Sequence, residues 1–259
     1  GVVRINITNM PYGVLLTQSV PPRRGVGITP IGRMPITSAV ALNLSWGYPW
    51  SLSAPWMNNT VYEFVPMVTM SDDITDVTTM LPFYNSNYIL YLNEPDLRGS
   101  GDYRSTMEEH ARKFHSIYVA AKRVNPSAMF IVGNVASSTD WLTSFIQTYR
   151  SIYGVLPSVK GWGFHLYQNP YTSQLFREKL LSYRQWQLNT CLCPGKEMWL
   201  TEFGHLFDET VARQVMVDQV TSLHLDSLPW LTRYAWFATL SSPWKGSLMS
   251  SYSPALYTP

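Results

Sequence analysis

The stretch Tyr-Ile-Leu-Tyr-Leu-Asn-Glu-Pro-Asp, residues 88–96, decides the fold of this chain. It begins as a run of apolar and aromatic residues and ends in an amide and an acid, Asn93 and Glu94. A second stretch of the same form, Glu-Met-Trp-Leu-Thr-Glu-Phe-Gly at residues 197–204, places Glu202 after its apolar run. Continuous apolar character is typical of parallel strands that are buried on both faces. Each stretch therefore predicts a buried strand with a carboxylate at its carboxyl end.

Eight short apolar runs recur along the chain, separated by segments long enough for a helix or a loop. Parallel strands that alternate with helices favour an α/β fold, and eight repeats predict closure into a (β/α)8 TIM barrel. The 259 residues suit one such barrel, so we expect a single domain over residues 1–259, with residues 1–22 as a lead-in segment across its floor. The runs are Arg24–Thr29, Val40–Trp46, Tyr62–Met70, Tyr88–Asn93, Met129–Val135, Trp162–Tyr167, Glu197–Thr201 and Arg233–Ala238.

Helical patterns follow at least four of these runs. Thr106 and Glu109 form a capping box at the start of one helix, and Gly154 is placed to end another. Between the second and third runs, residues 47–61 are rich in Pro, Trp and Asn and have no helical period, which predicts a shortened helix or a loop. The expected helices cover about residues 106–125, 140–153, 173–188 and 208–228.

The composition argues against several classes of function. Charged residues make up 14% of the chain, against roughly 25% in an average soluble domain, and the formal net charge is only +2. This balance gives no basic surface for nucleic acid, and no apolar run is long enough to span a membrane. Cys191 and Cys193 are too few for a structural zinc site, and a bridge between them would be strained, so we interpret them as free or loop-tightening thiols. We expect a monomer.

The carboxyl ends of barrel strands are where an active site would form. Nucleotide-loop and serine-elbow motifs are absent, and too few imidazoles converge for metal-dependent hydrolysis, so we expect no cofactor and no metal. Of the lysines, Lys160 and Lys196 precede their strands, and only Lys245 is left open for Schiff-base chemistry. The predicted strand-end residues are Trp46, Met70, Asn93, Glu94, Ser137, His165, Tyr167, Glu202, His205 and Trp236.

Glu94 and Glu202 end the fourth and seventh strands, which face each other across the expected barrel. Two carboxyl groups about 5–5.5 Å apart across a sugar are what retaining glycoside hydrolysis uses. The sequence therefore predicts this chemistry. A carbohydrate-binding protein that keeps the aromatic residues but not the catalysis is the alternative from another class.

Three motifs resemble the signatures of glycoside hydrolase family 128. They are Leu-Asn-Glu-Pro-Asp at 92–96, Trp-Leu-Thr-Glu-Phe at 199–203 and Arg-Tyr-Ala-Trp-Phe at 233–237. The resemblance covers most of the chain from about residue 23 to residue 237. It implies a retaining clan A barrel enzyme that cleaves β-1,3-glucan internally, and we expect it to act outside the cell. Exo action, or action on mannan or xylan, stays open because loop shape decides cleft length.

The resemblance also implies individual roles. Glu94 would be the acid/base and Glu202 the nucleophile. We expect Tyr167 to donate a hydrogen bond to Glu202 and Asn93 to donate to a sugar 2-hydroxyl. The remaining candidates are expected to contact substrate or to hydrogen-bond within the site, with core packing as the open alternative: Trp46, Trp50, His165 and Trp236.

Overall fold

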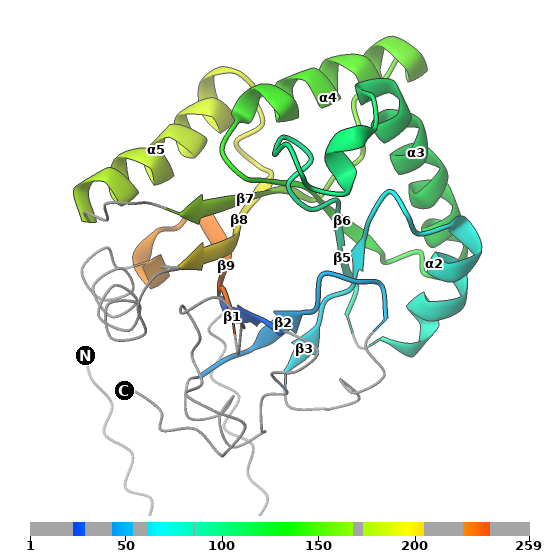
Figure 1. Ribbon diagram of the computed structural model, residues 1–259, viewed down its shortest axis with the longest axis horizontal. Helices are drawn as coiled ribbons and strands as arrows, with labels where there is room; N and C mark the ends of the chain where they lie inside the picture. The colour runs from blue at the N-terminus through cyan, green and yellow to red at the C-terminus, as the bar shows by residue number, and fades with distance from the viewer. Residues whose placement is uncertain are drawn as a thin grey trace, which may run out of the picture.

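The computed structural model describes residues 23–28, 43–53, 62–84, 86–167, 173–204 and 225–238. Nine parallel strands in these ranges form one sheet in the order β3-β2-β1-β9-β8-β7-β6-β5-β4, and Figure 1 shows them encircling the centre of the molecule. They are β1 (Arg24–Gly27), β2 (Trp46–Tyr48), β3 (Glu63–Phe64), β4 (Met67–Val68), β5 (Tyr88–Tyr91), β6 (Met129–Val135), β7 (Gly161–Tyr167), β8 (Glu197–Gly204) and β9 (Leu231–Trp236).

The two edge strands of this order, β3 and β4, are two halves of the third predicted run. Only Val65 and Pro66 separate them. The Val65 N–H donates to the carbonyl of Gly47 of β2, whereas the carbonyl of Pro66 accepts from the N–H of Leu90 of β5. Proline has no N–H to donate to a neighbouring strand, so the third run stops pairing with β2 at this point and begins to pair with β5. The chain itself closes the sheet, and the predicted (β/α)8 barrel with eight strand positions is confirmed.

Helices lie on the outside of the sheet (Figure 1). The helices predicted at 106–125, 140–153 and 173–188 are confirmed, and a further helix follows β4. Thr106 and Glu109 form the expected capping box, and Gly154 ends its helix with a left-handed φ of 72°. The helices are α2 (Ile74–Met80), α3 (Met107–Val124), α4 (Thr139–Tyr153) and α5 (Ser173–Asn189), with short 3-10 turns η1 (Leu81–Phe83), η2 (Asp102–Arg104) and η4 (Leu225–Ser227).

Three predicted segments fall largely outside the described residues. These are the lead-in at 1–22, most of the loop at 47–61 and most of the helix at 208–228, of which residues 225–227 form the turn η4.

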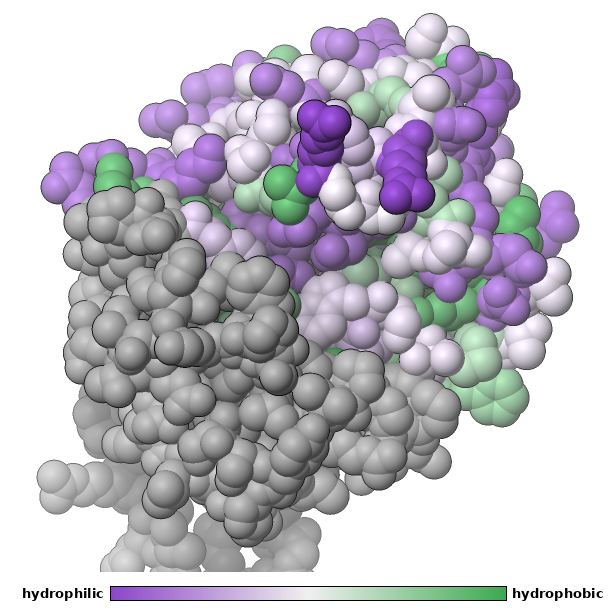
Figure 2. Space-filling view, viewed as in Figure 1, coloured by the Kyte–Doolittle hydropathy of each residue, from purple (hydrophilic) through white to green (hydrophobic). Residues whose placement is uncertain are grey.

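The sheet separates two apolar cores. The inner core fills the barrel and is led by aromatic side chains, whereas the outer core lies between sheet and helices. Buried side chains on both faces explain the near-continuous apolar runs of the sequence. The surface over α3 and α4 is mostly hydrophilic, with single apolar residues scattered over it (Figure 2). The buried residues of the inner core are Trp46, Tyr48, Val65, Met67, Leu90, Ile131, Trp199 and Ala235.

Two predictions about local structure are corrected. The second strand was expected at Val40–Trp46, but β2 begins at Trp46, so this residue lies at the amino end of its strand. Cys191 and Cys193 were interpreted as free or loop-tightening thiols; they are joined by a disulfide, so the free-thiol alternative is wrong. A left-handed φ of 54° at Leu192 turns the backbone between them, and their Cα atoms lie 5.2 Å apart, within the usual range for a bridge.

No helix among the described residues combines the length and the apolar character needed to cross a membrane.

Candidate active site

Glu94 lies directly beyond β5 at the carboxyl end of the barrel. Its φ of 47° and that of Leu92, 68°, are both in the left-handed region, so the chain turns sharply on either side of Asn93. The Glu94 N–H donates to the carbonyl of Asn134 on β6, over 3.0 Å. Its side chain is 19% exposed, which leaves one of the two acids of the site open to solvent.

A β-bulge turns Glu202 toward the interior of the barrel. Leu200 and Glu202 pair with consecutive residues of β7, so Thr201 is the extra residue of β8. Trp199 belongs to the inner core, while Leu200 and Phe203 belong to the outer core. In a regular strand Trp199 and Glu202 would face opposite sides, because side chains alternate with a period of two. Bulges that re-aim a side chain are common next to active sites.

A second irregularity, on β6, supports this bulge. The register of β6 shifts between Gly133 and Val135, and Asn134 between them has a φ of 46°. The Asn134 amide is fully buried; it donates to the carbonyl of Leu92 over 2.8 Å and accepts from the Thr201 hydroxyl over 3.0 Å. A single amide therefore links the ends of the strands that carry Glu94 and Glu202.

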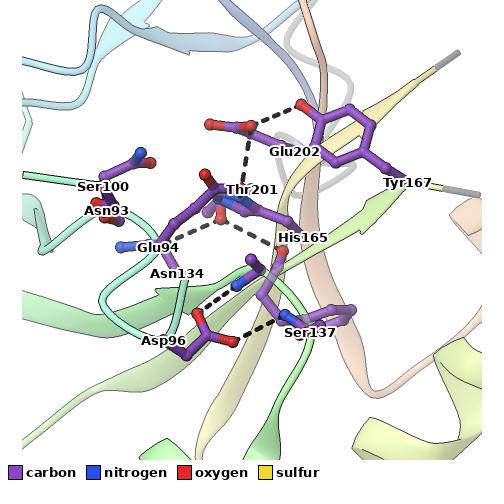
Figure 3. A network of polar contacts seen from close by, with 12 residues as sticks. Asn93, Glu94, Asp96, Ser100, Asn134, Ser137, His165, Tyr167, Thr201 and Glu202 are labelled. Carbon is purple, nitrogen blue, oxygen red and sulfur yellow. Dashed lines mark hydrogen bonds and ion pairs between the residues drawn. The ribbon is translucent and has the colours of Figure 1, made fainter. Parts of the chain in front are cut away.

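Glu94, His165 and Glu202 meet at the carboxyl ends of β5, β7 and β8 (Figure 3). The Nδ1 of His165 lies 2.9 Å from Oε1 of Glu94 and 3.4 Å from Oε2 of Glu202. One carboxylate oxygen from each acid and one ring nitrogen all lie within 4.8 Å of one another. The two acids predicted from the sequence are thus neighbours across a single gap.

Three donors surround Glu202. Tyr48 and Trp50 donate to Oε1 over 2.9 and 2.5 Å, and Tyr167 donates to Oε2 over 2.6 Å. Burial and the negative charge of Glu202 raise the pKa of both phenols well above the ordinary tyrosine value, so both keep the proton that they donate. Donors of this kind favour the charged form of a carboxyl group.

His165 is fully buried between the two acids. Burial by itself lowers its pKa, but the charge of Glu202 and the hydrogen bond to Glu94 outweigh burial and raise the pKa above the ordinary value of 6.5. Its other ring nitrogen, Nε2, has no hydrogen-bond partner. The imidazole therefore interacts with the two acids through one nitrogen.

Glu94, His165 and Glu202 also form a group, found among the described residues, whose ligand atoms are close enough for one metal ion. Both oxygens of Glu202 already accept hydrogen bonds from side-chain donors.

The structure places two of the predicted residues in hydrogen-bond contact with Glu202. Tyr167 donates to it as expected, whereas Trp50 uses its indole N–H on Glu202 instead of only lining a cleft. Asn93 is half-buried beside Glu94, and its buried Oδ1 has no hydrogen-bond partner. His205 and Lys245 lie outside the described residues.

Trp46 and Trp236 do not lie at the site, so for both residues the alternative of core packing holds instead of substrate contact. Trp46 is fully buried in the inner core, with its ring centroid 5.1 Å from that of Trp199. Trp236 is only 2% exposed and belongs to the outer core, because it follows Ala235, whose side chain points inward. Phe237 is the ring that reaches the site, with centroids 5.3 Å from Trp50 and 5.8 Å from Tyr167.

Sequence reasoning missed Tyr48, Asn134 and Phe237. The alternation of Trp46, Tyr48 and Trp50 was the available signal for Tyr48, since residues two apart share one face of a strand. No comparable signal marked Asn134, because its role depends on a bulge that pairing with β7 creates.

Gly25 and Gly27 of β1 leave room for the rings of Trp46 and Trp50. A Cβ at Gly25 would lie 2.3 Å from the Trp46 ring, and one at Gly27 would lie 2.4 Å from the Trp50 ring. The two glycines therefore allow close packing inside the barrel.

Several solved structures share this fold at low sequence identity. An endo-β-1,3-glucanase of family GH128, subgroup II, from Sorangium cellulosum has a TM-score of 0.69 at 17% identity, with 90% of this chain and 94% of that chain covered. A subgroup I endo-β-1,3-glucanase from Amycolatopsis mediterranei, in complex with laminaritriose, has a TM-score of 0.68 at 21% identity, with 90% and 95% covered. A subgroup VI exo-β-1,3-glucanase from Aureobasidium namibiae has a TM-score of 0.66 at 15% identity, with 92% and 94% covered.

No curated protein matches the sequence significantly. The family model described as glycosyl hydrolase catalytic core matches residues 25–255, which include both acids and all of the described strand residues except Arg24. The chain therefore belongs to the glycosyl hydrolase catalytic core family, and it is a glycoside hydrolase whose barrel has the fold of the GH128 enzymes.

Proposed function

We propose that this protein hydrolyses β-1,3-glucan at internal bonds by double displacement, with Glu94 as acid/base and Glu202 as nucleophile. The observation that carries the proposal is the unequal surroundings of the two acids, whose nearest oxygens lie within 4.8 Å. Glu202 is only 5% exposed and accepts hydrogen bonds from Tyr48, Trp50 and Tyr167. Glu94 is more exposed, and in the part of the chain that the structure describes its only side-chain partner is His165.

These surroundings suit one acid to each half of the reaction. In the first step Glu94 donates its proton to the glycosidic oxygen while the Glu202 carboxylate attacks the anomeric carbon. The bond to the leaving sugar breaks, and a glycosyl ester forms on Glu202. In the second step Glu94, now ionised, takes a proton from water, and that water displaces Glu202 with overall retention of configuration. The short gap between the acids supports retention, because inverting enzymes need room for a water between them.

The choice of substrate rests on the similar structures. Two of them are endo-β-1,3-glucanases and one carries laminaritriose, whereas another is an exo-β-1,3-glucanase. A polymeric substrate fits an enzyme that acts outside the cell, and the Cys191–Cys193 disulfide fits an oxidising compartment. Extracellular action is therefore part of the proposal.

The test is digestion of soluble β-1,3-glucan, mannan and xylan, with separation of the products by length. Internal cleavage predicts a ladder of laminari-oligosaccharides from β-1,3-glucan at early times, and NMR should show the β-anomer formed first. Release of monosaccharide alone would replace endo by exo action. Cleavage of mannan or xylan instead would overturn the proposed substrate, and binding without reducing ends would overturn catalysis.

Substitution of each acid tests the assigned steps. Glu202→Gln should lower kcat on the order of 10⁴-fold, because the amide cannot form the glycosyl ester. Glu94→Gln should lower kcat/KM on β-1,3-glucan by about 10²–10⁴-fold, because proton donation is lost. Both variants should keep the circular dichroism spectrum and Tm of the wild type. A Glu202→Gln enzyme with wild-type rates would remove this residue as the nucleophile.

A further inference from the structure

The turn that carries Glu94 needs to be held in place. Leu92 and Glu94, with φ values of 68° and 47°, adopt a conformation that side-chain-bearing residues rarely take. Such conformations persist only where the surrounding structure fixes them. The contacts that fix this turn therefore decide where the Glu94 carboxyl group lies.

Asp102 supplies the contacts on one side of the turn. This carboxylate is only 4% exposed although it lies in the loop between β5 and α3. Its Oδ2 accepts the N–H of Asn93 and its Oδ1 accepts the N–H of Met70 beyond β4, each over 2.8 Å. Ser100 completes the contact, since its hydroxyl donates to the carbonyl of Asn93 over 2.7 Å and accepts from the Asp102 N–H over 3.3 Å. Both backbone groups of Asn93 are thus held from one short segment.

Asp96 holds the other side of the turn. Its two carboxylate oxygens accept three consecutive backbone N–H groups beyond β6, those of Ala136, Ser137 and Ser138, over 2.7 to 3.0 Å (Figure 3). Asp102 and Asp96 therefore fix the Glu94 turn to the ends of the two neighbouring strands. Among the described residues, neither carboxylate has a hydrogen bond to Glu202 or His165, and Asp96 acts on His165 only through its charge.

We propose that Asp102 is a positioning residue for proton transfer, which holds the Asn93–Glu94 turn so that the Glu94 carboxyl group reaches the glycosidic oxygen. The inference rests on the proposed function of Glu94. A carboxylate with two acceptor oxygens is needed here, because an amide side chain offers one acceptor and would turn its NH2 group toward a backbone N–H. Displacement by about 1 Å at a reacting group can cost on the order of 10²-fold in rate.

The test compares substrates that differ only in their need for an acid. A laminari-oligosaccharide has a poor leaving group, a sugar alkoxide, and needs proton donation. In the 2,4-dinitrophenyl β-glycoside of laminaritriose the leaving group is a stable phenolate, which departs without a proton. Asp102→Asn should lower kcat/KM about 10- to 100-fold on the oligosaccharide, mainly through kcat, and less than about 3-fold on the dinitrophenyl glycoside. Equal losses on both substrates, or no loss in a folded variant, would overturn the inference.

Two further variants keep the test decisive. Ser100→Ala removes one contact of the same segment and should show the same substrate dependence in milder form, which decides the matter if Asp102→Asn does not fold. Asp226→Asn is the matched control: its carboxylate also joins two elements, through Arg24 at the amino end of β1 and Tyr234 within β9, and it has no described contact with Glu94 or Glu202. It should lower Tm without any substrate dependence.

Glu94→Gln separates failure of the inference from failure of the proposed function. If this variant shows the substrate dependence and both loop variants do not, only the inference about Asp102 is overturned. If Glu94→Gln itself loses activity equally on both substrates, the assignment of Glu94 as the acid fails, and the inference fails with it.

Discussion

At the residue scale, the two glutamates differ through the donors that surround them. Tyr48 and Tyr167 have raised pKa values through burial and the nearby Glu202 charge, so they donate over the whole working pH range. A hydrogen bond to a charged group contributes about 1.5–3 kcal/mol, more than a neutral one. These bonds stabilise the Glu202 carboxylate before it attacks. They also stabilise the negative charge that returns to the same oxygens when the glycosyl ester is broken.

Tyr167→Phe should therefore lower kcat/KM by about 10- to 100-fold, since each 1.4 kcal/mol corresponds to a factor of ten. The Tm should change little, because the ring that packs 5.8 Å from Phe237 is kept. Steady-state kinetics on a laminari-oligosaccharide provide the measurement. Tyr183→Phe is the control, because the Tyr183 hydroxyl is buried without a partner, and its removal should leave kinetics and Tm unchanged or raise Tm. Equal activity of Tyr167→Phe and wild type would contradict the prediction.

At the element scale, β1 serves as the flat surface against which the aromatic side chains of β2 and the following loop pack. Gly25 and Gly27 have no Cβ on the face that Trp46 and Trp50 occupy. Because Trp50 donates to Glu202, the packing of one strand controls a hydrogen bond at the site.

Gly27→Ala places a methyl group 2.4 Å from the Trp50 ring, so the ring must move away from Glu202. We expect a loss of stability of about 1–3 kcal/mol from overpacking, together with a fall in kcat/KM of about tenfold or more. Urea denaturation and kinetics measure the two effects. Gly195→Ala is the matched control, because a Cβ there meets nothing within 4 Å and both quantities should stay unchanged. A stable, fully active Gly27→Ala enzyme would show that Trp50 is not held by this strand.

At the scale of the whole molecule, the buried contact between His165 and two acids links stability to pH. The folded-state pKa of His165 is raised above 6.5. A group whose pKa is raised on folding adds stability that is fully present below the unfolded pKa and is lost as pH rises through the folded pKa. The negative charges of Glu202, Glu94 and Asp96 stabilise the protonated form of the His165 imidazole.

The free energy of unfolding of the wild type should therefore exceed that of His165→Gln mainly below about pH 6.5. This difference should become smaller at higher pH. Chemical denaturation of both proteins from about pH 5.5 to about pH 9 measures it. The other histidines cancel in the difference because both proteins contain them. A gap that is constant or widens with rising pH would show that His165 is neutral in the folded state.

Much of the barrel could be predicted because each element depends on local pattern. The capping box at Thr106 and the left-handed Gly154 fix helix ends through contacts within a few residues. The site was only partly predictable. Glu94 and Glu202 follow recognisable strands. In contrast, the burial of Trp236 in the outer core and the hydrogen bond from Trp50 to Glu202 depend on the side of the sheet toward which each side chain points. A shift of the strand register by one residue moves every side chain of the strand to the opposite face of the sheet.

The sequence by itself determined seven of the eight strand positions, three of the helices and the two acids, since apolar runs and capping residues act locally. Only the tertiary structure decided which side chains surround those acids. The bulges at Asn134 and Thr201 arise from the pairing of strands that are distant in the chain, and they reverse the side-chain alternation that a lone strand would keep. The contact of Asp102 with Met70, 32 positions away, exists only once β4 and β5 lie side by side.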